Sequence, residues 1–288
     1  MSEDEFIVFI VSAVITVLFI IKWYWYLIRS WPPRRNDLAR FALGCLPPVA
    51  LAIMLYTLKV LASFDVVDSE LFIAFYVLLG YAWLFLGVLL MSCFFDLSWI
   101  DDVVNLNNKA ALPAFAGGFL GLTVIYSGAN IGDGPGWWCV IFAGGLGLVT
   151  WLFLGAGICK ADDMSERITV ERDLGCGIRF GFYLLASGII LGRASGGDWT
   201  SFRMTVVEFY DVYDKWPVLL LAGLEAVVEK FYLHRFKKGV GGDTVFSSVF
   251  WGTLYVLFAI VSVMELLPDL PKNPIYGGAP TILRGMFL

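Results

Sequence analysis

Eight long apolar runs restrict what this chain can fold into. Each is close to the length, about 20 residues, that an α-helix needs to cross the hydrocarbon core of a bilayer. Apolar residues make up 59% of the chain and charged residues 16%, whereas soluble domains average about 45–50% and about 25%. The sequence therefore predicts an all-α, polytopic helical membrane protein and excludes a single soluble domain. The predicted spans are Phe6–Ile28, Phe41–Ala62, Leu71–Phe95, Ala110–Ala129, Trp137–Cys159, Leu174–Leu191, Val218–Leu233 and Val245–Leu267.

The loops between these runs carry unequal numbers of Lys and Arg, and most of these cations follow the odd-numbered runs. The positive-inside rule places such loops in the cytoplasm, so eight crossings leave both termini on the non-cytoplasmic side. The seventh run, Val218–Leu233, is short and contains two glutamates, so the side of the C-terminus depends on whether it crosses. Lys22 and the aromatic run 23–26 are predicted to lie at the membrane–water interface, where Trp and Tyr are enriched.

The even-numbered runs begin alike, which indicates an internal repeat. Each follows a short polar residue, and these markers lie 66 to 70 residues apart. We expect four helical hairpins, at about 1–70, 71–136, 137–200 and 201–267, in one membrane domain, followed by an irregular tail over 268–288. Short polar residues at these positions favour N-caps; the alternative is a polar ring at a cytoplasmic mouth. The markers are Asp37, Asn107, Asp173 and Asp243.

Glycines recur four residues apart in the fourth and sixth runs. Small residues at this spacing allow helix backbones to approach closely in a membrane. We therefore expect tight helix packing at these faces, with association between subunits as the alternative. The glycine pairs are Gly117/Gly121, Gly177/Gly181 and Gly188/Gly192.

The middle of the chain resembles a known family. The resemblance is carried by the segment from Asp96 through Asn107 and Asn108, the glycine-rich fourth run, and residues 172–178 and 188–192. These segments are similar to the "domain of unknown function 350" family of bacterial membrane proteins, mainly over residues 71–200. The second run departs from it, with a Pro-Pro pair where the family-like helices carry glycine. The resemblance implies a multi-pass protein of the bacterial inner membrane, built of helical hairpins, and implies no reaction.

Several site classes lack the residues that they need. His234 is the only histidine, so histidine-rich zinc sites and a Ser-His-Asp triad elsewhere in the chain are excluded. The five cysteines form no C-x-x-C pair, and no long basic run suggests nucleic acid. Acidic clusters after the third and fifth runs are interpreted as solvated loops, with a divalent ion as the alternative. We expect no catalytic residues, no metal and no cofactor.

Glu225 is the residue that most suggests function, because it falls near the middle of the seventh run. A carboxylate in a membrane is costly and usually faces a bundle interior or a cation. The candidate cations are Lys22, Lys59 and Arg179. The interpretations left open are a structural ion pair or protonated acid, an interface with a partner protein, and a proton or cation route. Glu229 is expected nearer the cytoplasmic interface.

Two functions follow from these observations. The first is a non-enzymatic integral subunit or scaffold in the inner membrane, in contact with membrane lipids and with a membrane-protein partner or a second copy. The alternative is a channel or transporter for protons, ions or small solutes that uses Glu225, with Glu229, Lys59 and Arg179 as the other candidate polar residues.

Overall fold

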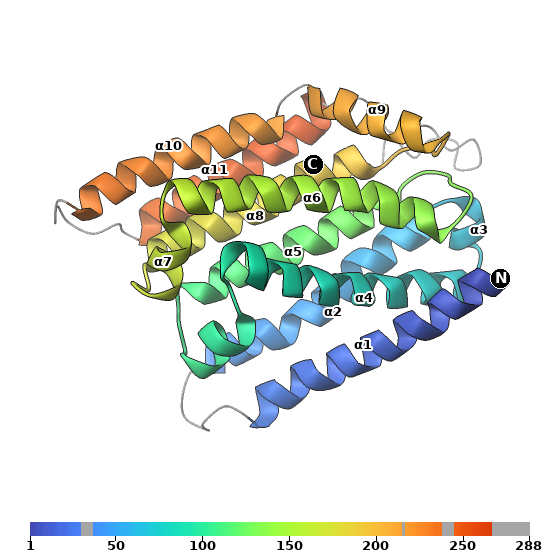
Figure 1. The fold of residues 1–288 in the computed structure, drawn as a ribbon, viewed down its shortest axis with the longest axis horizontal. Helices are drawn as coiled ribbons and strands as arrows, with labels where there is room; N and C mark the ends of the chain where they lie inside the picture. The colour runs from blue at the N-terminus through green and yellow to red at the C-terminus, as the bar shows by residue number, and fades with distance from the viewer. Residues whose placement is uncertain (30–36, 215–216, 238–244, 267–288) are drawn as a thin grey trace.

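The computed structural model describes residues 1–29, 37–214, 217–237 and 245–266. Within these residues every regular element is a helix, and the one extended pairing is an isolated bridge between Ala62 and Gly132. The elements are α1 (Glu3–Arg29), α2 (Asp37–Val60), α3 (Phe64–Val67), α4 (Glu70–Phe95), the π-helix η1 (Trp99–Asn105), α5 (Ala111–Ala129), α6 (Trp137–Ala161), α7 (Met164–Thr169), α8 (Leu174–Ser195), α9 (Phe202–Asp214), α10 (Pro217–Lys237), α11 (Val245–Val261) and the π-helix η2 (Ser262–Leu266) (Figure 1).

Seven helices among the described residues are long and apolar enough to cross a membrane: α1, α2, α4, α5, α6, α8 and α11 with η2. The chain is therefore a multi-pass, all-α membrane protein. The seventh predicted span, Val218–Leu233, forms α10, which has 21 residues and so extends about 31 Å at about 1.5 Å per residue. That length matches the bilayer core of about 30 Å, but the charged residues of α10 lower its hydropathy. The crossing of α10 stays a prediction.

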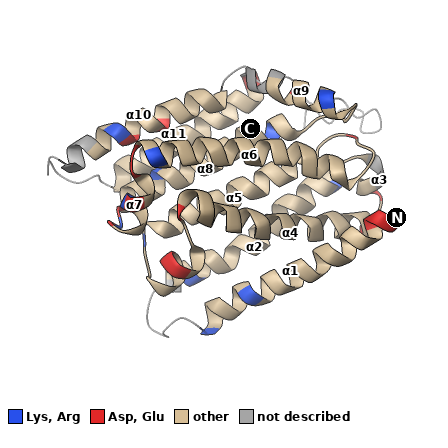
Figure 2. Cartoon of the chain, in the orientation of Figure 1, with Lys and Arg blue, Asp and Glu red and all other residues tan. Residues whose placement is uncertain are grey.

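The long helices form two layers. The second helices of the four hairpins pack in the order α2, α5, α8, α11, and the first helices pack in the order α1, α4, α6, α10. In Figure 1 successive long helices reverse direction, so η1 and α7 lie at one end of the bundle and the N-terminus, α3 and α9 at the other. Figure 2 shows that charged residues gather at these two ends and that the middle of the bundle is largely uncharged.

The most extensive pairing is between α5 and α8, and glycines make it possible. A Cβ atom added at Gly117 would lie 1.9 Å from the carbonyl oxygen of Gly181, and one added at Gly128 would lie 2.0 Å from that of Gly192. Any larger side chain would separate the backbones at these points. The prediction that glycines allow close helix packing is therefore confirmed, and the contact lies within one chain.

Pro47 and Pro48 interrupt the hydrogen bonding of α2 without ending the helix. Proline lacks an N–H group, so each leaves the carbonyl four residues earlier without its helical donor. The Trp23 indole N–H donates to the Leu43 carbonyl at 3.1 Å, and the Tyr24 hydroxyl donates to the Gly44 carbonyl at 3.0 Å. Side chains of α1 thus satisfy both freed carbonyls, as a membrane interior requires.

Two residues of the aromatic run at the end of α1 have different surroundings within the fold. Trp23 is fully buried and stacks on Trp99 of η1, with ring centroids 4.2 Å apart. Trp25, by contrast, is 55% exposed and lies under the guanidinium of Arg29. Trp23 can be buried in the core because its indole N–H donates to the Leu43 carbonyl of α2.

Candidate functional site

A cluster of buried charged side chains joins α7, α8 and α10. Arg167 donates through Nη1 to Oε2 of Glu229 at 2.6 Å and through Nη2 to Oδ2 of Asp173 at 2.7 Å. Arg179 donates through Nε to Oε1 of Glu229, and through Nη2 to Oε2 at 3.1 Å. Arg179 and Glu229 are 0% exposed and Arg167 is 1% exposed. Glu229 therefore accepts from two arginines inside the bundle.

The side chain of Arg179 is held on two further sides. Its Nη1 donates to Oγ of Ser248 on α11 at 2.8 Å. Its guanidinium lies 4.2 Å from the centre of the Tyr232 ring on α10, a separation that permits cation–π attraction. The Tyr232 hydroxyl in turn bonds to Oγ of Ser247. These contacts connect the last hairpin to α8 through polar groups.

The carboxyl group of Glu225 lies one helical turn from Glu229 on α10. It is 0% exposed, and neither of its oxygens has a hydrogen-bond partner among the described residues. The buried hydroxyl of Tyr255 on α11 lies beside it and interacts with its carboxyl electrostatically. A buried charge is costly unless it is paired. Glu225 is therefore most stable when it holds a proton or a cation.

The structure changes several of the predicted partners. Arg179, a candidate cation for Glu225, makes its carboxylate hydrogen bonds with Glu229, and Glu229 is fully buried within the protein. Lys59 forms an exposed pair with Glu70 at 3.3 Å instead. Lys22 is exposed on α1. Sequence reasoning placed Arg167 in a loop and missed its role in this cluster.

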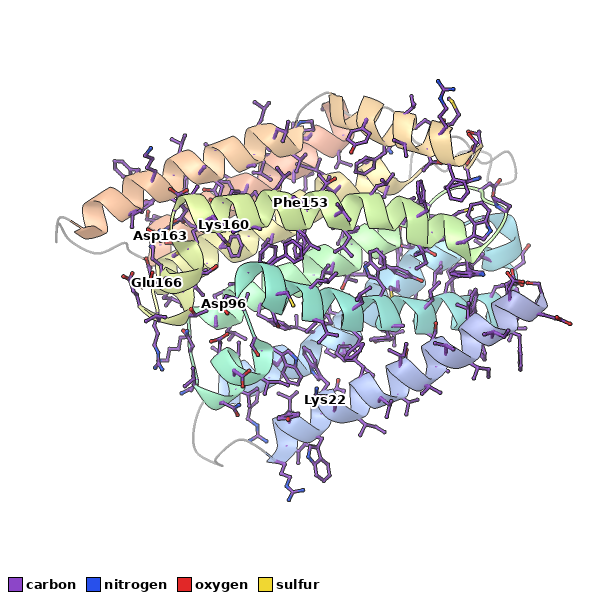
Figure 3. All side chains as sticks on the ribbon, viewed as in Figure 1. Lys22, Asp96, Phe153, Lys160, Asp163 and Glu166 are labelled. Carbon is purple, nitrogen blue, oxygen red and sulfur yellow. The ribbon has the colours of Figure 1, made fainter. Side chains whose placement is uncertain are left out.

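Asp162, the residue that follows α6, links the cluster to the end of the bundle. It is 4% exposed. Burial raises the pKa of its carboxyl, and the neighbouring charge of Glu229 adds to this effect. Figure 3 shows Asp163 and Glu166 at the α7 end of the bundle. Asp162 thus places a second buried acidic group within electrostatic range of Glu229.

The marker residues of the repeat fall in different places. Asp173 caps α8, accepting from the Cys176 N–H at 3.1 Å. Asn107 does not cap α5: its φ is 51°, in the left-handed region, and Asn108 accepts from the Ala110 N–H at 2.9 Å instead. Asp37 is the first residue of α2, but its side chain lies outside the described part, and Asp243 lies outside the described residues.

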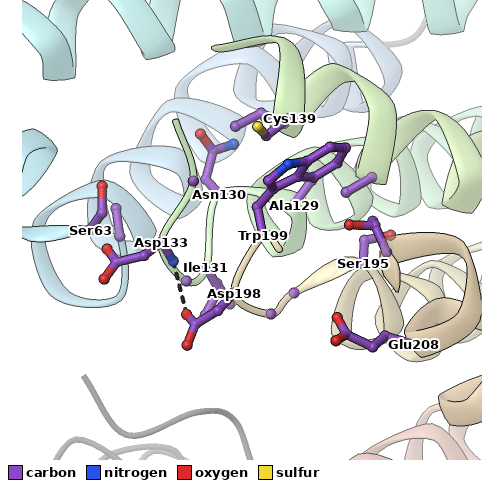
Figure 4. A pocket seen from close by; sticks show the side chains of 18 of the residues that line it. Ser63, Ala129, Asn130, Ile131, Asp133, Cys139, Ser195, Asp198, Trp199 and Glu208 are labelled. Atoms are coloured by element: carbon purple, nitrogen blue, oxygen red, sulfur yellow. Dashed lines mark hydrogen bonds between the residues drawn. The ribbon is translucent and has the colours of Figure 1, made fainter. Parts of the chain in front are cut away.

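A small pocket lies at the opposite end of the bundle, among the loops that follow α5 and α8 (Figure 4). The Asp133 N–H donates to Oδ1 of Asp198 at 3.0 Å across it, and Glu208 of α9 also lines it. Its volume is about 60 Å³, whereas one water needs about 10–15 Å³ on the same measure. The pocket can hold a few waters but no organic substrate.

The acidic loop clusters form no metal site in the part of the chain that the structure describes, where no three His, Cys, Asp or Glu side chains are grouped to hold an ion. Two of these acids shape η1 instead. The Asp101 N–H donates to Oγ of Ser98 at 3.1 Å, and the Ser98 N–H donates to Oδ2 of Asp102 at 2.7 Å.

Comparison with known proteins identifies the family. No curated protein and no solved structure matches the chain. The model of the family described as Domain of Unknown Function (DUF350) matches residues 46–196, just over half of the chain. The match runs from the middle of α2 to the end of α8 and thus contains Arg167, Asp173 and Arg179, while Glu225 and Glu229 lie outside it. The chain belongs to the DUF350 family.

Proposed function

We propose that the chain moves protons or a small cation across the membrane and that the Glu225 carboxyl is the site that binds and releases them. The observation that carries this proposal is the complete burial of Glu225 without a hydrogen-bond partner among the described residues. Ionisable groups inside a membrane domain that face its interior usually mark ion or proton pathways.

The charged cluster supports a path from one end of the bundle to this site. Asp162 lies at the end of α6, and Glu229 interacts with it electrostatically. Glu229 is one turn from Glu225 on α10, and Arg179 stabilises its charge from α8. The two neighbours act on Glu225 in opposite senses: the Glu229 charge favours its protonated form, and the Arg179 charge favours its ionised form. This balance allows the group both to take up and to release a proton.

The test is a flux measurement in liposomes that contain the purified chain, a trapped pH dye and an imposed potassium gradient. Addition of valinomycin sets the potential and drives proton entry. We expect flux in the wild type, loss of flux in Glu225→Gln, and retained flux in Glu70→Gln, which removes an exposed carboxylate at the start of α4, away from the charged cluster. Equal flux in the wild type and Glu225→Gln, or no flux above empty liposomes in either, would reject the proposal.

We also propose that the protein resides in the cell inner membrane, with both termini on the non-cytoplasmic side. Two observations support this orientation. Lys and Arg residues of the described chain gather at the end of the bundle that holds α7, and the N-terminus lies at the other end (Figures 1 and 2). The length of α10 allows the even number of crossings that this orientation requires.

A second candidate function is a scaffold for another membrane protein or a second copy. It is favoured by the open edges of the two layers. In the outer helices α1 and α11, only 22% and 28% of the residues in the most apolar 18-residue stretch are buried, whereas the values for α5 and α8 are 72% and 78%. Purification from native membranes in mild detergent tests this function. A partner at fixed stoichiometry, or a dimer, supports it, and a monomer without partners contradicts it.

A further inference from the structure

An apolar groove lies between α6 and the helix α9, at the end of the bundle opposite the charged cluster. Its volume is about 610 Å³. The rings of Trp138 and Phe142 pack against Phe202 at its head, with centroid separations of 5.1 and 4.9 Å. Gly145 leaves its floor open, because no atom lies within 4 Å of an added Cβ. Its lining comes from α6, between residues 137 and 150, and from Phe202 and Tyr210 of α9.

The length of the groove matches one leaflet of a bilayer. Its lining on α6 extends from Trp137, the first residue of this candidate span, to Thr150. At about 1.5 Å per residue this is about 20 Å, compared with about 15 Å for half of a hydrocarbon core of about 30 Å. The groove therefore runs from the level of the headgroups toward the middle of the membrane.

The walls and the mouth of the groove suit an amphiphile. Phe202, Tyr210 and Val149 are each about half exposed, so the groove is open to the surrounding lipid. Trp and Tyr rings are typical of headgroup depth. Arg203 follows Phe202, a lining residue, at the start of α9 and is exposed, so a basic residue is the chain neighbour of the aromatic head of the groove.

We propose that this groove binds one acyl chain of an anionic glycerophospholipid, with the lipid phosphate beside Arg203. The apolar walls accept the chain, and the guanidinium complements the phosphate, which it can bind through two N–H groups. The amphipathic helix α9 holds the lipid against α6. The proposal is independent of proton or cation movement through Glu225.

The experiment uses the full chain in nanodiscs that contain phosphatidylglycerol with a photoactivatable diazirine in one acyl chain. After illumination, peptide mapping locates the label. We expect label on residues 137–150 and 202–210. Gly145→Leu should reduce it roughly tenfold, as expected when about two methylene groups lose their burial. Gly157→Leu is the matched control: it lies on the same helix, has no atom within 4 Å of an added Cβ, and does not line the groove.

A second variant tests the headgroup. Arg203→Gln should reduce labelling by phosphatidylglycerol but leave labelling by an uncharged diacylglycerol with the same diazirine chain unchanged. Label spread evenly over the exposed faces of α1 and α11 in the wild type would overturn the proposal even if Gly145→Leu failed to fold. Equal labelling of the two glycine variants, crosslinks to a second copy at the groove, or no effect of Arg203→Gln would also overturn it.

Discussion

Replacing Glu229 by glutamine tests how strongly the buried charges hold the last hairpin on the bundle. The Glu229 carboxylate accepts from Arg167 Nη1 at 2.6 Å and from two N–H groups of Arg179. With glutamine, both guanidinium groups lose this charge while they stay buried. Arg167 still bonds to Asp173 at 2.7 Å, whereas Arg179 loses the carboxylate that accepts two of its N–H groups.

The size of the effect follows from burial. Removing one partner of a buried ion pair costs about 3–5 kcal/mol. In a chain of this size, 1 kcal/mol corresponds to about 2–4 °C in Tm, so we expect Tm to fall by roughly 6–20 °C. Glu225 offers partial compensation, because its carboxyl can ionise near Arg179. The double variant Glu225→Gln/Glu229→Gln should therefore lose more than the sum of the two single variants.

The assay is thermal unfolding of the purified chain in detergent, followed by size-exclusion chromatography to check the folded fraction. Glu70→Gln is the control, because the Lys59–Glu70 pair has side chains that are 52% and 85% exposed. Exposed pairs contribute little, so its Tm should change by about 2 °C or less. A Glu229→Gln variant as stable as Glu70→Gln would refute the reasoning that this network stabilises the fold.

Three further predictions concern packing, membrane hydrogen bonds and pH. Gly181→Ala should lower Tm more than Gly145→Ala in the same assay. A Cβ atom at Gly181 would lie 2.2 Å from the Pro113 carbonyl oxygen, whereas one at Gly145 would have no atom within 4 Å. Equal shifts in Tm would contradict this packing. Trp23→Phe should cost about 1–3 kcal/mol by thermal unfolding, since it leaves the buried Leu43 carbonyl without its donor, and an unchanged Tm would be the contrary result. Burial raises the pKa of Asp102 above its ordinary 3.8, so the protonated form is favoured in the fold and Tm should decline as pH rises above that value; Asp102→Asn should flatten the pH profile, and an identical profile would count against it.

Much of the fold was readable from the sequence because apolar runs and small residues act locally. The length of each run indicates a membrane helix, and the glycine spacing predicts close helix packing, which the structure shows between α5 and α8. The family resemblance over residues 71–200 was also confirmed, and the match begins earlier, at residue 46 in α2. The Pro-Pro pair interrupts only the hydrogen bonds, so α2 remains continuous.

The partners of the charged residues were not readable, because they depend on contacts between distant segments. Glu229 and Arg167 are 62 residues apart in the chain, and nothing in the local pattern of α7 shows that its arginine points inward. The sequence could not decide whether Asn107 or Asn108 caps α5, because the two adjacent residues have the same side chain. Only the backbone conformation, with a positive φ at Asn107, decides between them.

The crossing of α10 is the central claim, since it puts Glu225 inside the membrane and both ends of the chain on one side. Single cysteines at Ser2, Glu166 and Glu265, in a variant without the five native cysteines, can be labelled with an impermeant maleimide in sealed vesicles of known orientation. We predict that Ser2→Cys and Glu265→Cys react from the same side and that Glu166→Cys reacts only from the other. Reaction of Ser2→Cys and Glu265→Cys from opposite sides would contradict the crossing of α10.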